Sequence, residues 1–250
     1  MKVGGKGGSK HLKRFPSPSF WPIHVKESKW ITKPKAGPHS IKVAIPLSVV
    51  LREILGYAKT RRETKLIVSK GVVKVDGKTK RDHKYPIGLM DVLEITDAKS
   101  TFRMVPFKSK GLSLLKITKD EGKFKLCQIN NKVFLNDEGI QLNFNDGRNV
   151  VLSKDSAQSV DSYNTRDSIK IEIPSQKILG HFKFIEGKYG LAVAGRNIGR
   201  HGKIVGIESA TASKRATVSI QDQKGQTFRT VADYVFAIGD DEPEIKLPED

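Results

Sequence analysis

The chain has 250 residues, with 45 Lys and Arg against 27 Asp and Glu, for a formal net charge of +18. This length allows one to three small domains. The single cysteine, Cys127, excludes an internal disulfide and a zinc site built from several cysteines. It lies in a strand-like apolar stretch, so we expect a buried thiol. Nothing resembles a secretion signal, and no apolar run is long enough to span a bilayer. We therefore expect a soluble cytoplasmic protein.

The positive charge is concentrated at one end of the chain. Residues 1–85 contain 21 Lys and Arg against 5 Asp and Glu, whereas residues 86–250 contain 24 against 22. A general solubility function would spread the charge, so the asymmetry indicates that the N-terminal third binds a polyanion. A solvated basic face without a partner remains the alternative.

Residues 1–40 lack a continuous apolar period and contain five prolines. Aromatic residues are interleaved with cations, a pattern that suits stacking on bases while the cations meet phosphates. We expect a basic arm that becomes ordered on binding, with a plain disordered tail as the alternative. The candidate RNA-binding residues of the arm are Lys10, Lys13, Arg14, Trp21 and Trp30.

Residues 41–96 are predicted to form a compact helix and strand module. Leu47, Val50, Leu51, Ile54 and Leu55 have helical spacing, which predicts an amphipathic helix over residues 46–56. A second, capped helix is predicted from the capping-box pair Thr60 and Glu63. We expect Leu66 and Ile67 to form its apolar edge and the cations to crowd the opposite side. Strands at 72–75 and 91–95 and a tight turn at Asp76-Gly77 follow. The candidate phosphate-binding residues are Arg61, Arg62, Lys65, Lys74, Lys78, Lys80 and Arg81.

Residues 97–173 alternate with a period of two and predict a central antiparallel β domain. The expected strands are 123–129, 132–135, 140–144, 149–152 and 168–173, with a turn at Asn130-Asn131 between the first two. The charge of this segment is almost neutral. We therefore expect a spacer or a protein-facing module rather than the main RNA binder.

A third module is predicted over residues 174–239. Strands at 204–208, 217–221, 226–231 and 234–239 follow a glycine-rich loop at 195–203. Such a loop allows backbone N–H groups and the cations Arg196, Arg200 and Lys203 to approach a phosphate backbone closely. A solvated loop without a ligand is the alternative. The acidic tail at 240–250 is expected to be mobile.

No catalytic or cofactor-binding motif is recognisable. Gly202-Lys203 is followed by Ile204 and is not preceded by the glycine that a P-loop requires. The six histidines never pair at metal-ligand spacing. We therefore expect no catalytic residues, no cofactor, no metal site and no small-molecule substrate.

Two segments are similar to known RNA-binding modules. Residues 46–95 resemble the S4-type RNA-binding domain, on residues such as Leu51, Thr60-Arg61, Gly71 and the run from Val73 to Lys78. Ile185–Glu208 resembles a KOW motif, with Gly199 at the position of its characteristic glycine. Together with His11–Arg14, Gly37-Pro38-His39 and Val235–Gly239, these segments make the whole chain similar to the S4e family of the small ribosomal subunit, the archaeal and eukaryotic type.

This resemblance implies an α+β multi-module protein. Its expected parts are an extended basic arm, a two-helix-plus-hairpin RNA-binding module, a central antiparallel β domain and a C-terminal SH3-like KOW barrel. It further implies a structural constituent of the cytoplasmic ribosome that binds small-subunit rRNA and neighbouring ribosomal proteins, with no membrane partner. A KOW-containing transcription-elongation or other regulatory RNA-binding factor is the main alternative. An RNA-modifying enzyme would need a catalytic domain that the sequence does not indicate.

Overall fold

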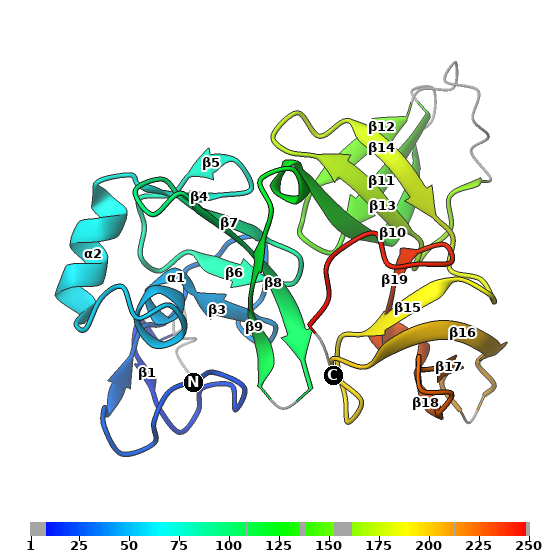
Figure 1. Ribbon diagram of the computed structural model, residues 1–250, viewed down its shortest axis with the longest axis horizontal. Helices are drawn as coiled ribbons and strands as arrows, with labels where there is room; N and C mark the ends of the chain where they lie inside the picture. Colours follow the sequence, from blue (N-terminus) through cyan, green and yellow to red (C-terminus); the bar gives the residue numbers. More distant parts are fainter. Residues whose placement is uncertain (1–8, 109, 136–138, 153–161, 213, 249–250) are drawn as a thin grey trace, which may run out of the picture.

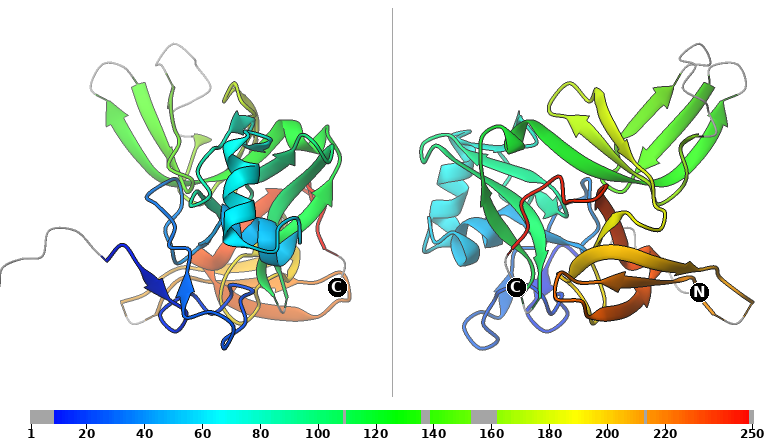
Figure 2. Two further views of the ribbon diagram at one scale, coloured as in Figure 1. Left: turned by 90° about the vertical axis from the view of Figure 1, so that its left-hand side faces the viewer. Right: turned by 45° about the vertical axis from the view of Figure 1, so that its right-hand side comes forward.

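The computed structural model describes residues 9–108, 110–135, 139–152, 162–212 and 214–248. The described chain is mostly β, with few helices and several antiparallel sheets (Figure 1). The N-terminal part with the helices lies at one end of the molecule. The central and C-terminal sheets lie together at the other end, as the rotated views in Figure 2 also show.

The N-terminal segment is packed onto the helical module from residue 9 onward. Strands β1 (Leu12–Lys13) and β2 (Trp30–Ile31) pair with each other. Trp21 is only 2% exposed, and its indole N–H donates to the carbonyl of Ala44 at 2.9 Å. Trp21, Ile23 and Leu12 belong to the same core as the first helix. The expectation of an arm that is ordered only on binding is therefore wrong for residues 9–40.

The two predicted helices are present, and the first differs in kind. It starts as the short α-helix α1 (Leu47–Val49) and continues as the π-helix η1 (Val50–Ile54), in which Leu55 N donates to Val50 O at 3.0 Å. Helix α2 (Arg61–Ser69) follows its predicted cap. Its buried face consists of Thr64 and Val68, whereas Leu66 is 56% exposed. The expected apolar edge is wrong for Leu66 and correct for Ile67, which is half-buried and packs against the core on the side of positions 64 and 68.

The sheet of this module is larger than the sequence suggested. Strands β4 (Val73–Val75), β5 (Lys78–Thr79), β7 (Val92–Ile95), β8 (Ser100–Phe107) and β9 (Gly111–Ile117) form one sheet in the order β5-β4-β7-β8-β9. Strands β3 (Ala44–Pro46) and β6 (Pro86–Gly88) form a separate pair. The predicted boundary at 96/97 thus cuts through a continuous sheet, since β7 pairs with β8.

The central sheet has the order β12-β11-β10-β13-β14. Its long strand β10 (Phe124–Leu135) pairs with β13 (Ser168–Glu172) along its first half and with β11 (Gly139–Phe144) along its second. Strands β12 (Asn149–Leu152) and β14 (Ile178–Phe182) form the edges. The predicted turn at Asn130-Asn131 is absent: β10 runs through it with a register shift between Ile129 and Asn131. The asparagines mark a bulge where the strand changes partner.

The C-terminal sheet has the order β18-β17-β16-β15-β19. Its strands are β15 (Tyr189–Ala192), β16 (His201–Glu208), β17 (Thr217–Gln221), β18 (Thr227–Val231) and β19 (Val235–Gly239). Two 3-10 turns, η2 (Glu121–Lys123) and η4 (Ala232–Tyr234), complete the described helical elements.

The described part of the acidic tail is packed rather than free. Ile245 is buried in a core with Phe236 and Ile238. Lys246 N donates to the Glu121 carboxylate at 3.1 Å. The expectation of a mobile tail is therefore wrong for residues 240–248, because an apolar side chain within the acidic run anchors it across the other modules.

A buried cluster of charges joins the N-terminal module to the central sheet. Lys125 of β10 lies 2.5 Å from Asp91, 3.0 Å from Asp76 and 2.9 Å from Asp146. Arg148 completes it with contacts of 2.6 Å to Asp76 and 3.1 Å to Asp146. Burial opposes the charged form of Lys125, but Asp91 and Asp76 outweigh burial and raise the pKa of its ammonium group. The cluster thereby fixes the placement of the β4–β5 turn against the central sheet.

Candidate nucleic-acid interface

Helix α2 holds its arginines on a well-capped first turn. Thr60 Oγ1 accepts from Glu63 N at 3.2 Å, and the Glu63 carboxylate accepts from Lys59 N at 2.8 Å and from Thr60 N at 3.4 Å. The hydrogen bond from Lys59 N is the largest cause that lowers the pKa of Glu63. Glu63 thus occupies the N–H groups of Lys59 and Thr60, and the exposed side chains of Arg61 and Arg62 on the first turn are available to a phosphate.

The cations of α2 and the following hairpin are unneutralised. Within the described ranges, no carboxylate lies within 4.0 Å of any of the seven predicted cations of this module: Arg61, Arg62, Lys65, Lys74, Lys78, Lys80 and Arg81. The pKa of the nearby His83 is lowered first by burial and then by the charge of Arg61, with smaller contributions from Lys84 and Lys65, whereas Asp82 acts in the opposite direction. Arg61 and Lys65 thus add positive charge next to this histidine.

The β4–β5 hairpin is held in place from its tip. Asp76 and Gly77 have φ values of 48° and 71°, the geometry of a tight turn between twisted strands. The Asp76 carboxylate is turned inward, accepting from Val92 N at 2.9 Å and pairing with Lys125 and Arg148. Lys78 and Arg81 are exposed, while Lys74 and Lys80 are half-buried. The Lys80 ammonium also lies 4.4 Å from the centroid of the Tyr85 ring.

The N-terminal candidates divide into surface and structural residues. Trp30 is 52% exposed, and the ammonium groups of Lys13 and Lys29 lie 5.7 and 5.8 Å from its ring centroid. Lys10 is also exposed. Trp21 is buried and donates its N–H to Ala44, so its assignment as a base-stacking residue is wrong. Arg14 donates to the Ile23 carbonyl at 3.0 and 2.7 Å and to Ser17 Oγ at 3.0 Å; it serves chiefly to hold the 14–23 loop.

The glycine-rich loop at 195–203 does not present an open cradle. A Cβ on Gly199 would lie 2.5 Å from Lys108 N, so the close approach that this glycine permits is to the β8–β9 hairpin of the same chain. Arg200 pairs with Asp222 and lies 4.2 Å from the Phe228 ring, and Lys203 lies 3.0 Å from Asp241. Only Arg196 among the three predicted cations is exposed without a carboxylate partner in the described chain. Arg200 is therefore held mainly by contacts within the chain, whereas Lys203 is exposed and paired with Asp241 only at the surface.

The sequence reasoning missed some cations on the same surface. Lys29 shares the Trp30 ring with Lys13, and Lys84 contributes to the field at His83. Lys70 is exposed at the end of α2. Lys29 could have been found from its position next to Trp30 in the sequence. The positions of Lys70 and Lys84 on this surface depend on how the module packs.

Over the described ranges, no group of three or more His, Cys, Asp or Glu could hold a metal ion, and no helix is long and apolar enough to cross a membrane.

Comparisons with known proteins identify the family. The S4 domain model matches residues 45–93, the RS4NT domain model matches residues 6–42, and the model described as Ribosomal family S4e matches residues 98–178. A protein of Staphylothermus marinus named small ribosomal subunit protein eS4 is 46% identical over 245 residues, 97% of each chain. The chain belongs to the S4e family of ribosomal proteins.

Other S4e proteins give the same result. The Desulfurococcus amylolyticus protein of the same name is 42% identical over 249 residues, 99% of each chain. The crystal structure of the 30S ribosomal protein S4e from Thermoplasma acidophilum matches with a TM-score of 0.65 and 32% identity, covering 78% of this chain and 95% of that one. The family predicted from the motifs is thus confirmed. S4e proteins are ribosomal structural proteins and not enzymes, in agreement with the expected lack of catalytic function.

Proposed function

We propose that the protein is a structural constituent of the small ribosomal subunit that binds rRNA and supports subunit assembly and translation in the cytoplasm. The observation that carries this proposal is the contrast between two sets of cations. Those of α2 and the β4–β5 hairpin have no carboxylate partner in the described chain, whereas Arg200 and Lys203 of the C-terminal module are paired with Asp222 and Asp241. A set of cations without carboxylate partners, most of them exposed, is suited in an S4e protein to RNA phosphates.

The phosphate contacts are assigned to α2 and the hairpin. The helix contacts the RNA backbone through Arg61, Arg62 and Lys65. The hairpin contacts it through Lys74, Lys78, Lys80 and Arg81. Phosphate contacts position a protein without reading sequence, so specificity comes from RNA shape and from stacking. Trp30 supplies one stacking surface, since its exposed ring is already flanked by Lys13 and Lys29.

We further propose that strands β15–β19 form an SH3-like KOW barrel, which therefore begins later than the predicted residue 174, because β14 pairs with β13 in the central sheet. Five consecutive antiparallel strands and the glycine-rich 195–203 loop support this assignment. Its contact with RNA is proposed to centre on Arg196, which is exposed and has no carboxylate partner in the described chain, while the charges of Arg200 and Lys203 are offset by Asp222 and Asp241. The central sheet is nearly neutral, and we propose that it faces neighbouring small-subunit proteins. We also propose that β8 and β9 belong to the same module as β7, because they continue its sheet.

Sedimentation of a cell lysate at moderate and high salt tests the proposal. We expect the protein to travel with small subunits and to resist removal by moderate salt. A pool that is free or bound to RNA polymerase at all salt concentrations would contradict the proposal and support the KOW-containing regulatory factor. A second, unrelated small-subunit protein detected in the same gradient marks the position of intact subunits.

A further inference from the structure

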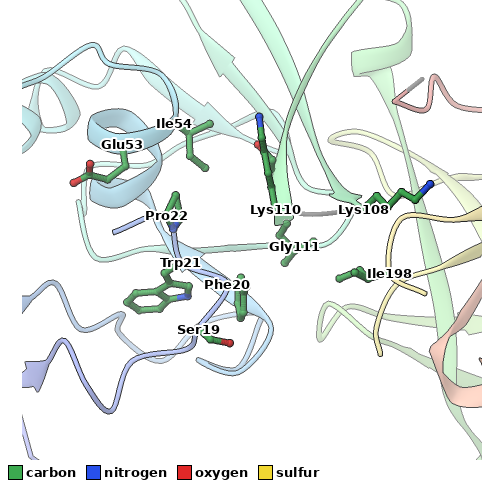
Figure 3. Close-up of a pocket in the computed structure, with 12 residues that line it drawn as sticks. Ser19, Phe20, Trp21, Pro22, Glu53, Ile54, Lys108, Lys110, Gly111 and Ile198 are labelled. Carbon is green, nitrogen blue, oxygen red and sulfur yellow. The ribbon is translucent and has the colours of Figure 1, made fainter. Parts of the chain in front are cut away.

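A crevice of about 750 Å³ lies where the N-terminal segment, η1, the β8–β9 hairpin and the C-terminal loop meet (Figure 3). Six of its lining residues define its chemical character: Phe20, Trp21, Ile54, Lys110, Leu112 and Ile198. They come from four segments far apart in the sequence. The crevice therefore exists only in the complete fold, and no sequence motif marks it.

The walls of the crevice are apolar and partly exposed. Phe20, Ile54 and Ile198 are each half-buried, so each keeps a face available for a ligand. Trp21 forms a closed side, because its ring is buried and its N–H is already bonded to Ala44. An aromatic and an aliphatic face across a crevice suit a flat, unstacked base.

The charge at the crevice is positive. Lys110 is exposed and has no carboxylate partner among the described residues, and Lys108 extends on the side of Ile198 in Figure 3. The one lining carboxylate, Glu53, is paired with Arg52 at 2.5 Å and points away from Lys110 in the same view. An anion is therefore the favoured ligand at the mouth, next to the apolar walls.

Two close approaches bring the walls of the crevice together. Gly111 has φ of 69°, and a Cβ there would lie 2.7 Å from Phe20 Cβ, so the hairpin lies tightly against the N-terminal segment. A Cβ on Gly199 would lie 2.5 Å from the backbone N of Lys108, so the C-terminal loop lies equally tightly against the hairpin. Ile54 belongs to the π-helix η1, a wide turn of the kind that often occurs at functional sites.

We propose that this crevice binds one unpaired nucleotide of the rRNA, with its base between Phe20 and Ile54 and its phosphate at Lys110. This inference rests on the proposed rRNA-binding function and adds a base-recognition site to it. The α2 surface supplies sequence-independent phosphate contacts, whereas an inserted base discriminates a looped-out or bulged strand from a regular helix.

Photo-crosslinking tests the inference directly. Full-length protein is bound to a small-subunit rRNA transcript carrying 4-thiouridine, irradiated and analysed by mass spectrometry. Nucleotide adducts are expected on residues 19–22 or 110–113. In assembled small subunits with the same label, these residues should again crosslink to rRNA; adducts on α2 or the β4–β5 hairpin without any in the crevice would overturn the inference.

Two variants measure the contribution of the crevice. Phe20→Ala should weaken rRNA binding by about tenfold or more, the effect of losing one base stack. Lys110→Ala, an exposed position that keeps the fold even if Phe20→Ala does not, should lower the salt slope by roughly 0.7–0.9. Lys177→Ala, an exposed lysine of the central module, is the matched control and should change neither.

The outcomes separate this inference from the proposed function. If Lys110→Ala binds rRNA with the affinity and salt slope of the wild type, and no adducts form in the crevice, the nucleotide site is overturned. The assignment of rRNA binding to the α2 surface would be unaffected by that result. Absence of rRNA binding by the wild-type protein would overturn both.

Discussion

Replacing Lys125 with Met should destabilise the protein severely. The Lys125 ammonium is 1% exposed and lies within 3.0 Å of three carboxylates, those of Asp76, Asp91 and Asp146. Methionine preserves the length of the side chain, but it leaves the buried carboxylates of Asp76 and Asp146 with Arg148 and that of Asp91 with His39. Removing one partner of a buried ion pair costs about 3–5 kcal/mol. For a chain of this size that corresponds to a fall in the midpoint of thermal unfolding of about 6–20 °C.

Thermal unfolding followed by circular dichroism measures this effect. The control is Lys123→Met, because Lys123 lies two residues away and pairs with Asp120 at the exposed surface; its midpoint should not change. Adding Asp146→Asn should cost less in the Lys125→Met background than in the wild type, since the asparagine removes an uncompensated buried charge. A Lys125→Met midpoint equal to that of the wild type would refute the view that the cluster holds the two modules together.

Three further predictions concern local features. Thr60→Ala removes the side-chain cap of α2 and should lower the free energy of unfolding, measured by urea titration, by about 1 kcal/mol. Ser69→Ala is the control, because it leaves the cap intact. Equal effects of the two substitutions would contradict the capping role of Thr60. Gly199→Ala places a side chain at φ of 85° against the backbone of Lys108; it should cost at least about 1–2 kcal/mol, whereas Gly225→Ala, also at positive φ but with open space, should show only the strain component. Burial raises the pKa of the Cys127 thiol, so native protein should not react with thiol reagents between pH 7 and 9 but should react fully in denaturant; rapid native labelling would show that β10 opens.

Local signals in the sequence were sufficient for α2 and the tight turn. The pair Thr60 and Glu63 marks a capping box that the structure contains, and Asp76-Gly77 forms the expected turn. Both depend on residues within a few positions of each other, where backbone geometry dominates. The identity of the buried face of α2 was not predictable in the same way, since Leu66 is more apolar than Thr64 yet lies on the exposed side.

Contacts between distant segments were the part that could not be predicted. Asp76 looked like a turn residue, but its carboxylate meets Lys125, 49 positions away. Trp21 was interpreted as a surface aromatic because prolines and cations surround it, whereas its partner is the carbonyl of Ala44. Arg200 has a partner 22 positions away in Asp222. In each case the neighbouring residues in the sequence suggested one role for the side chain, whereas a partner distant in the sequence determines its role in the fold.

The salt dependence of rRNA binding distinguishes the α2 surface from the C-terminal loop as the main site of phosphate contact. Affinity of the full-length protein for a small-subunit rRNA transcript is measured from low to high salt for the wild type, for Arg61→Ala with Arg62→Ala, and for Arg200→Ala with Lys203→Ala. Each lost phosphate contact should reduce the log–log slope by roughly 0.7–0.9, so the α2 pair should flatten the slope by about twice that amount. The C-terminal pair, already neutralised by Asp222 and Asp241, should leave the slope almost unchanged. An unchanged slope in the α2 variant, or a larger loss in the C-terminal variant, would contradict the assignment of the RNA-binding surface.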